Sequence, residues 1–188
     1  QGGRISAVID IKTKDGNKKR LSGLISGSPF QSKVLLEGPI SVLKESGGGS
    51  TSFILTGKTS YIDQTSKQLY KRVNNGNGLP FSYTDLYGKV SFNAANGSKV
   101  NLFGFNFLDK VKYQGIADLG WKATGGGASL SLIPGSASML IGANLGYSDY
   151  AIDLKEADGA PRQSKINGFN LGLDFTSFGA HDEFRYGF

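Results

Sequence analysis

The chain has 188 residues, which is enough for one domain or for part of a larger one, and 28 of these residues are glycine. The absence of cysteine excludes disulfides, thiolate metal sites and cysteine nucleophiles, and the single histidine excludes a multi-histidine metal site within this chain. No apolar run approaches the roughly 18 residues of a membrane-spanning helix. Lysine and arginine total 21 against 15 acidic residues. This basic excess is scattered and forms no stripe with interleaved aromatics, so we predict no nucleic-acid partner.

Two-residue periodicity dominates the sequence, and helical periodicity is almost absent. In residues 169–175, for example, Phe169, Leu171 and Leu173 alternate with small or polar residues. In chain order, this alternation predicts strands at 4–13, 18–27, 32–38, 51–61, 82–93, 98–108, 116–133, 137–149, 164–176 and 182–188. We therefore predict an all-β chain.

The predicted strands are long. Most exceed the ~5–6 residues typical of soluble sheets and reach the ~9–11 residues that a tilted transmembrane strand needs. Within the segment 116–133, the run Gly125, Gly126 and Gly127 predicts a bulge or bend.

The predicted connections are of two kinds, which fall at opposite ends of an up-and-down sheet. Tight turns are predicted at 93–97, 134–136 and 177–181, and longer polar loops at 62–80, 109–115 and 150–163. Outer-membrane barrels show the same asymmetry, with short periplasmic turns and long outer loops. The connections at 27–31 and 39–50 fit this asymmetry less well.

Alternating strands also occur in soluble β-sandwiches, which bury their apolar faces in a core between two sheets. The strands predicted here are longer than those of most sandwiches. Their non-apolar positions are rich in glycine, serine and asparagine, which suits the lumen of a barrel. We therefore favour an antiparallel, up-and-down transmembrane β-barrel over a soluble sandwich.

Several aromatic residues lie near the predicted strand ends, where an interfacial girdle of a membrane barrel would place them. A role for one or two of them in stacking against a ligand stays open. These residues are Tyr61, Tyr83, Tyr87, Phe105, Phe107, Tyr113, Tyr147 and Tyr150.

Four segments carry a resemblance to a known family. The stretch 2–16, GGRISAVIDIKTKDG, resembles the end of the plug domain in TonB-dependent outer-membrane transporters, where a glycine pair precedes an apolar strand and a Thr-Lys pair. Three later segments are similar to Bacteroidetes members of this family: LEGPI at 36–40, GKTSYID at 57–63 and SFGAHDEF at 177–184. The chain departs from the family pattern in two places. Lys58 and Thr59 stand where the family favours two arginines. The stretch 8–14 lacks the fuller Thr-Thr-Lys ending of SusC-like glycan importers, and this second departure disfavours that subfamily.

The resemblance implies two domains: residues 1–16 would be the end of the plug, and residues 17–188 the N-terminal part of a transmembrane barrel. The family's barrel has 22 strands, so about nine strands preceded by the last plug strand would form a partial barrel. We therefore expect a fragment that missing sequence or another chain completes.

The same resemblance implies a receptor that imports a scarce solute across the outer membrane of a Gram-negative bacterium. The implied partners are outer-membrane lipid and the TonB system, which acts through a plug N-terminus that is not in this chain. A surface lipoprotein or another chain completing the barrel is a further implied partner.

Two other functions remain open. The ending Phe184-x-Tyr186-x-Phe188 looks like the C-terminal assembly signal of outer-membrane proteins, so the alternative is a small stand-alone outer-membrane barrel with a structural or passive-pore role. The third hypothesis is a soluble, secreted β-domain that binds a surface glycan. The transported substrate and the ligand-binding residues stay unknown at this point.

No catalytic residue, cofactor or metal site is predicted, and we do not expect an enzyme. His181 and Asp182, next to Glu183, could in principle serve a hydrolase, but they lie in a predicted tight turn and are interpreted as solvated residues. The run Gly47-Gly48-Gly49 lacks the lysine and the following helix of a phosphate-binding loop.

One group of acidic residues is a further candidate binding site. Asp149, Asp153, Glu156 and Asp158 could bind a cation or a basic ligand. Basic residues are interspersed among them, so we interpret the group as a solvated outer loop. These basic residues are Lys155, Arg162 and Lys165.

Overall fold

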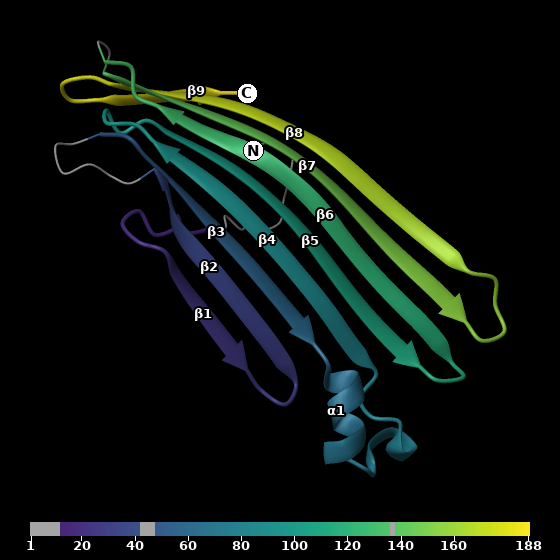
Figure 1. Cartoon of the computed structure of the whole chain (residues 1–188). Helices are drawn as coiled ribbons and strands as arrows, with labels where there is room; N and C mark the ends of the chain where they lie inside the picture. Colours follow the sequence, from purple (N-terminus) through teal and green to yellow (C-terminus); the bar gives the residue numbers. More distant parts are fainter. Residues whose placement is uncertain (1–11, 42–47, 136–137) are drawn as a thin grey trace.

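The structure, a computed structural model, describes residues 12–41, 48–135 and 138–188. Its elements are β1 (Ser22–Gly27), β2 (Gln31–Ser41), β3 (Ser50–Ser60), α1 (Ile62–Leu69), η1 (Val73–Gly76), β4 (Phe81–Asn93), β5 (Lys99–Tyr113), β6 (Ala117–Leu132), β7 (Met139–Glu156), β8 (Arg162–Phe178) and β9 (Glu183–Gly187). All strands belong to one antiparallel sheet in the order β1 to β9. Figure 1 shows this long, curved sheet, with β1 at one edge and β9 at the other. The predicted all-β, up-and-down sheet of about nine strands is confirmed, and the sheet is open.

The chain enters the sheet later than predicted. We expected a strand from residue 18, whereas β1 begins at Ser22. The side chain of Asn17 accepts hydrogen bonds from the backbone N–H groups of Lys19 and Arg20 at 3.0 and 3.1 Å, which bends the chain before β1. The predicted strand at 4–13 lies outside the described residues, apart from its last two positions.

Two of the predicted long loops are strand. β5 continues to Tyr113 and β7 to Glu156, so the loop predictions at 109–115 and 150–163 are wrong for most of their residues. Val111, Leu119 and Leu154 are cross-strand neighbours in this extension. Their alternation with charged residues is that of a strand, and we misread the high charge as loop.

The remaining long connection, 61–80, contains the only helices of the described residues. We predicted no helix there. α1 is short, and Thr65 hydrogen-bonds from its side chain to the carbonyl of Tyr61 at its start. The hydroxyl of Ser66, which is fully buried, accepts a hydrogen bond from the N–H of Leu79 at 2.7 Å and ties the returning chain to α1. Figure 1 places α1 at the end of the sheet where the β5–β6 and β7–β8 hairpins turn, which we call the helix end.

The sheet has one apolar and one polar face. Directly opposed residues share a face, so the cross-strand register defines each row. A central row of the apolar face is Phe53, Val90, Leu102, Ala128, Leu145 and Leu171. The adjacent row of the polar face is Ser52, Ser91, Asn101, Ser129, Asn144 and Gly172. The apolar and polar rows therefore alternate across six strands, which confirms the alternation predicted from the sequence.

The apolar face is exposed. Among the described residues, only Ile54 and Ala151 are buried hydrophobics. Leu55, Leu86 and Leu171, all on the apolar face, are 51, 53 and 63% exposed. Soluble monomers rarely expose a continuous apolar patch larger than a few hundred Å2. A second layer of some kind therefore belongs on this face.

The glycine run in β6 forms no bulge. Gly125, Gly126 and Gly127 keep an unbroken register with β5 and β7, so the predicted bulge is wrong. The rings of Phe103 and Phe105 lie over this run: a Cβ at Gly125 would come within 2.6 Å of the Phe105 ring, and one at Gly127 within 2.9 Å of the Phe103 ring. The glycines make room for aromatic side chains from the neighbouring strand.

Candidate functional site

The best-built polar cluster of the described residues lies on the polar face of β4 and β5. Lys89 and Ser91 project to this face because each is one residue away from an apolar-face position in β4. Lys99 of β5 lies opposite Asn93 on the same face. The side chain of Lys89 is only 6% exposed, which is unusual for lysine and requires a partner.

Asp15 supplies that partner from the segment 12–20, which precedes the sheet. One of its carboxylate oxygens lies 3.1 Å from the Lys89 ammonium and the other 2.7 Å from that of Lys99. The Ser91 hydroxyl donates a hydrogen bond to the carboxylate at 3.0 Å, and Lys18 lies at 4.0 Å. Partial burial raises the pKa of Asp15, but the hydrogen bonds from Lys99, Lys89 and Ser91 outweigh it and lower the pKa to about 2. Asp15 is therefore ionised at neutral pH.

Further contacts join the same segment to the sheet. The Lys89 ammonium also donates to the backbone carbonyl of Thr13 at 2.9 Å, and the Thr13 hydroxyl lies 2.7 Å from that of Tyr87. Lys14 forms an ion pair with Glu37 of β2 at 3.0 Å. Together with the Asp15 cluster, these contacts hold the segment against β2, β4 and β5. The arrangement is a docking site for the chain's own N-terminal segment.

A glycine allows this close approach. Gly16 is buried, and a Cβ at this position would lie 1.9 Å from the backbone carbonyl oxygen of Phe53 in β3. No real side chain tolerates such a distance, so only glycine fits here. The segment thus lies in backbone contact with β3 as well.

Next to this cluster, the polar face forms a pocket of about 470 Å3. Lys99, Asn101, Ser129 and Asp174 are among the residues that line it. The Asn101 amide donates to the Ser129 hydroxyl at 3.1 Å. The pocket is polar and open, and it offers hydrogen-bond donors and acceptors but no nucleophile activated by a base.

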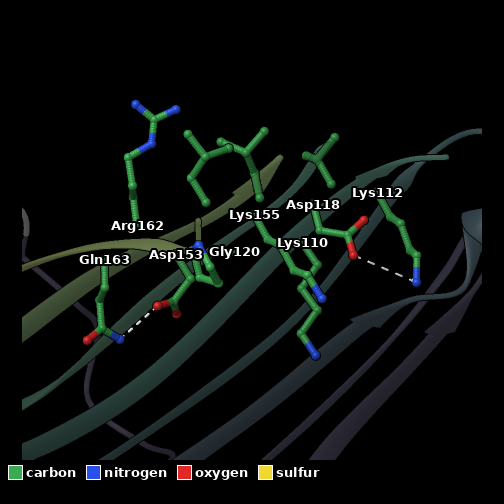
Figure 2. A pocket seen from close by; sticks show the side chains of 12 residues that line it. Lys110, Lys112, Asp118, Gly120, Asp153, Lys155, Arg162 and Gln163 are labelled. Atoms are coloured by element: carbon green, nitrogen blue, oxygen red, sulfur yellow. Dashed lines mark hydrogen bonds and ion pairs between the residues drawn. The ribbon is translucent and has the colours of Figure 1, made fainter. Parts of the chain in front are cut away.

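A second pocket, of about 630 Å3, lies at the helix end of β5–β8. Figure 2 shows its side chains on two sides of the sheet: Lys110, Lys112 and Lys155 project to one side and Arg162 to the other. Cross-strand register places the three lysines on the apolar face and Arg162 on the polar face. This end of the apolar face is therefore charged.

The residues weighed for catalysis do not assemble. His181 and Asp182 lie in the turn between β8 and β9, which is closed by a hydrogen bond from the Gly179 N–H to the Asp182 carbonyl at 2.8 Å. Both residues are exposed. Gly47 lies outside the described residues, and Gly48 and Gly49 lead directly into β3, not into a helix. His181 and Asp182 are therefore exposed turn residues, as interpreted from the sequence.

The acidic group is divided among separate partners. Asp149 pairs with Lys165 at 2.8 Å, Asp153 accepts a hydrogen bond from Gln163 at 2.7 Å, and Glu156 pairs with Arg162. All three contacts span the β7–β8 hairpin. In the part of the chain that the structure describes, no three potential metal ligands come together.

The predicted aromatic girdle is mostly wrong. Of the eight residues, Tyr147 lies on the apolar face, whereas the other strand residues lie on the polar face. Tyr61 lies just after β3 and donates a hydrogen bond to the carbonyl of Ser28 at 2.5 Å. Tyr83 and Tyr113 lie near strand ends, as predicted, but on the polar face. The other polar-face members are internal to their strands. The polar-face set is Tyr83, Tyr87, Phe105, Phe107, Tyr113 and Tyr150.

The sequence did not single out Asp15, Lys89 and Lys99. Lys89 is a lysine flanked by apolar-face neighbours at the centre of a strand, which was the available signal. Its partner Asp15 lies 74 residues before it in the chain, and alternation alone does not bring the two together.

None of the helices in the described residues has the length and apolarity to cross a membrane. A comparison of the chain with protein-family models, with characterised proteins and with solved structures finds no match. Function is therefore inferred from the two faces of the sheet and from the Asp15 cluster.

Proposed function

We propose that this chain is part of the wall of an outer-membrane barrel, in a TonB-dependent receptor that imports a scarce solute. The apolar face contacts lipid and the polar face lines the lumen. Residues 1–16 form the end of the plug, and the segment around Asp15 is where the plug joins the wall. The exposed apolar face, continuous over the sheet, is the observation that carries the proposal.

The dimensions of that face support a bilayer as its second layer. In β7 the apolar positions run from Met139 to Tyr147, and the same face turns polar at Asp149. This nine-residue run equals the ~9–11 residues of a transmembrane strand. β4 to β8 are 13 to 18 residues long, well beyond the ~5–6 residues typical of soluble sheets.

The polar face supports a lumen that holds protein. Asp15 and Thr13 reach the wall from a segment that precedes the first strand, as the end of a plug would. The ion pairs to Lys89 and Lys99 lie on the side of the sheet away from the apolar face. These contacts support a segment that lies inside a barrel formed by the sheet curving around it.

The open edges support a larger barrel over the small stand-alone one. β9 pairs with β8 only along residues 174–178 of β8, and the backbone groups of Leu173 and Phe188 exchange hydrogen bonds next to this pairing. The β8 residues 162–172 have no further neighbour among the described residues. Lipid offers no water to satisfy such an edge, so additional strands must cover it.

Cysteine labelling tests the lipid-facing assignment, because these 188 residues contain no cysteine and any cysteine elsewhere in the complete receptor can first be replaced by serine. We would introduce Leu145→Cys or Leu171→Cys on the apolar face and the matched neighbours Asn144→Cys or Asn170→Cys on the polar face. In the complete receptor in outer membranes, a water-soluble maleimide should label the polar-face pair and leave the apolar-face pair unlabelled. Equal labelling of both pairs would contradict a membrane wall and favour the soluble β-domain.

Transport is tested separately. Cells lacking the complete gene should lose uptake of one member of a panel that contains an iron siderophore, cobalamin, a peptide and an oligosaccharide. Disrupting TonB should abolish the same uptake. Lipid-facing labelling with uptake that is independent of TonB would instead favour a passive pore.

A further inference from the structure

Toward the helix end, the two faces of the sheet exchange their character. On the apolar face, the rows beyond Asp149 carry charged residues such as Lys110 and Lys155, which project to one side of the sheet in Figure 2. On the polar face, the rows at the same level are mostly apolar. One of these rows is Phe81, Val111, Leu119 and Leu154, and the row beside it is Tyr83, Asp109, Trp121 and Ile152.

The apolar residues of these rows adjoin a pocket. Val111, Leu119 and Leu154 line the pocket of about 630 Å3 at the helix end. This volume lies within the ~300–1,000 Å3 of small-molecule sites, which are mostly apolar and contain a few polar groups that orient the ligand. Arg162, which also lines the pocket, already pairs with Glu156.

Asp109 is the polar group that stands out beside this pocket. Across β4 to β7 it is the only charged residue of the two rows, and it lies directly between Tyr83 and Trp121. Opposed residues have Cβ atoms only ~4.5–5.5 Å apart, so an aromatic residue adjoins the carboxylate on each side. The Asp109 side chain is exposed and forms no ion pair or hydrogen bond with another described residue.

The nearest cation on the same face is used elsewhere. Lys58 of β3 lies opposite Asp85, and its ammonium nitrogen is 4.6 Å from the centre of the Tyr83 ring. This contact shows that an aromatic ring of the surface already accepts a cation. Asp109, one row further toward the helix end, is left without a counter-charge.

We propose that Asp109, Tyr83 and Trp121 bind the positively charged nitrogen of an organic cation. The carboxylate supplies the counter-charge, and the two rings supply a cation–π attraction, which is strongest for tryptophan. The apolar body of the same molecule lies over the aliphatic residues of the pocket. This inference rests on the proposed function, because it takes the polar face as a lumen that solutes enter, and it names the class of solute.

The test compares three water-soluble probes that share a phenyl ring and differ in charge. These are benzyltrimethylammonium, benzyl alcohol and benzenesulfonate. Binding to the complete receptor in phosphatidylcholine nanodiscs is measured by isothermal titration calorimetry, with empty nanodiscs as the blank. The variants are Asp109→Asn and Trp121→Leu. The matched control is Asp118→Asn, which removes an exposed carboxylate from the apolar face at the same end of the sheet.

The wild type and the control should bind the cation at least about tenfold more tightly than the neutral alcohol or the anion. Asp109→Asn should weaken binding of the cation about tenfold, and Trp121→Leu about fivefold. Equal affinity of the wild type for all three probes would overturn the inference, and this comparison needs no variant. An equal loss in Asp109→Asn and Asp118→Asn would also overturn it, since a general effect of net charge would then explain the binding.

Two further outcomes separate this inference from the proposed function. Selective binding of the cation without TonB-dependent uptake of any solute would support the site and contradict the proposed function alone. Binding of none of the probes, together with lipid-facing labelling and TonB-dependent uptake, would overturn the site and leave the proposed function intact.

Discussion

The two sides of the sheet follow the same alternation but differ in what covers them. In β3 and β4, the segment 12–20 lies on the polar face, and Ser52, Lys89 and Ser91 are at most 7% exposed. In β8, the residues 162–171 are exposed on both faces. Ile166 on the polar face and Phe169 on the apolar face are 67 and 68% exposed.

This difference shows that alternation sets the direction of a side chain, whereas a covering partner sets its burial. A lysine becomes buried on the polar face because Asp15 reaches it, and leucines stay exposed on the apolar face because no protein layer lies there. The proposed function supplies the missing layers of β8: lipid on one side and the plug on the other. The predictions below test both sides of the comparison.

The largest effect is expected at the covered side, from Asp15→Asn. This change leaves Lys89 nearly buried with no counter-charge, which costs about 3 kcal/mol in similar buried pairs. The loss should appear as local opening of the segment 12–20, because the sheet itself is unchanged. Hydrogen exchange at the amides of Lys19 and Arg20, which bond to Asn17, measures this opening.

The matched control is Asp118→Asn, which removes an exposed carboxylate 3.8 Å from Lys112. Exposed pairs of this kind contribute about 0–1 kcal/mol. Protection at Lys19 and Arg20 should therefore stay as in the wild type. If Asp15→Asn and its control behave alike, the segment is held by other contacts and the Asp15 cluster is not its anchor.

At the uncovered side, Leu171→Arg tests whether lipid is the missing layer. An arginine facing the middle of a bilayer destabilises a barrel by about 2.5 kcal/mol, whereas the same side chain facing the lumen is tolerated. Asn170→Arg, one residue away on the polar face, is the comparison. Urea unfolding of the complete protein in vesicles measures both. Equal stability of the two variants would mean that no bilayer contacts this face.

The Asp15 cluster also predicts a pH dependence. The pKa of Asp15 is lowered from 3.8 to about 2, so its contribution is complete above about pH 4 and is lost as the pH falls toward 2. The contribution amounts to roughly 2 kcal/mol. Pepsin, which is active over this range, should cleave near the exposed Leu21 faster as the pH falls. In Asp15→Asn this acceleration should be absent, since the group that titrates is gone.

Much of the fold could be predicted from the sequence because alternation is a local signal. The alternation of apolar and polar residues around Leu145 and Leu171 predicts both the strand and the face on which each side chain lies. The continuation of β5 and β7 past residues 108 and 149 was missed because charged residues there resemble a loop. The glycine run at 125–127 was misread because its reason, the rings of Phe103 and Phe105, comes from another strand.

The site was less predictable because it depends on contacts that span the chain. Asp15 meets Lys89 only after the segment 12–20 folds back over the polar face. That Lys110, Lys122 and Lys155 share the apolar face becomes visible only once the register of β5, β6 and β7 is known. Charge was visible in the sequence, but its grouping on one face was not.

The smallest effect, and the most direct comparison of the two sides, comes from one substitution made twice. Gly16→Ala places a Cβ against the Phe53 carbonyl oxygen, at 1.9 Å before relaxation, and the segment must move away at a cost of about 1 to 2 kcal/mol. Gly168→Ala in β8 meets nothing within 4 Å, so its stability should stay within about 0.5 kcal/mol of the wild type. Both are measured by hydrogen exchange and by urea unfolding of the complete protein. If Gly168→Ala lost as much stability as Gly16→Ala, the polar face of β8 would be covered as tightly as that of β3. The difference in exposure between β3 and β8 would then exist only in the part of the protein described here.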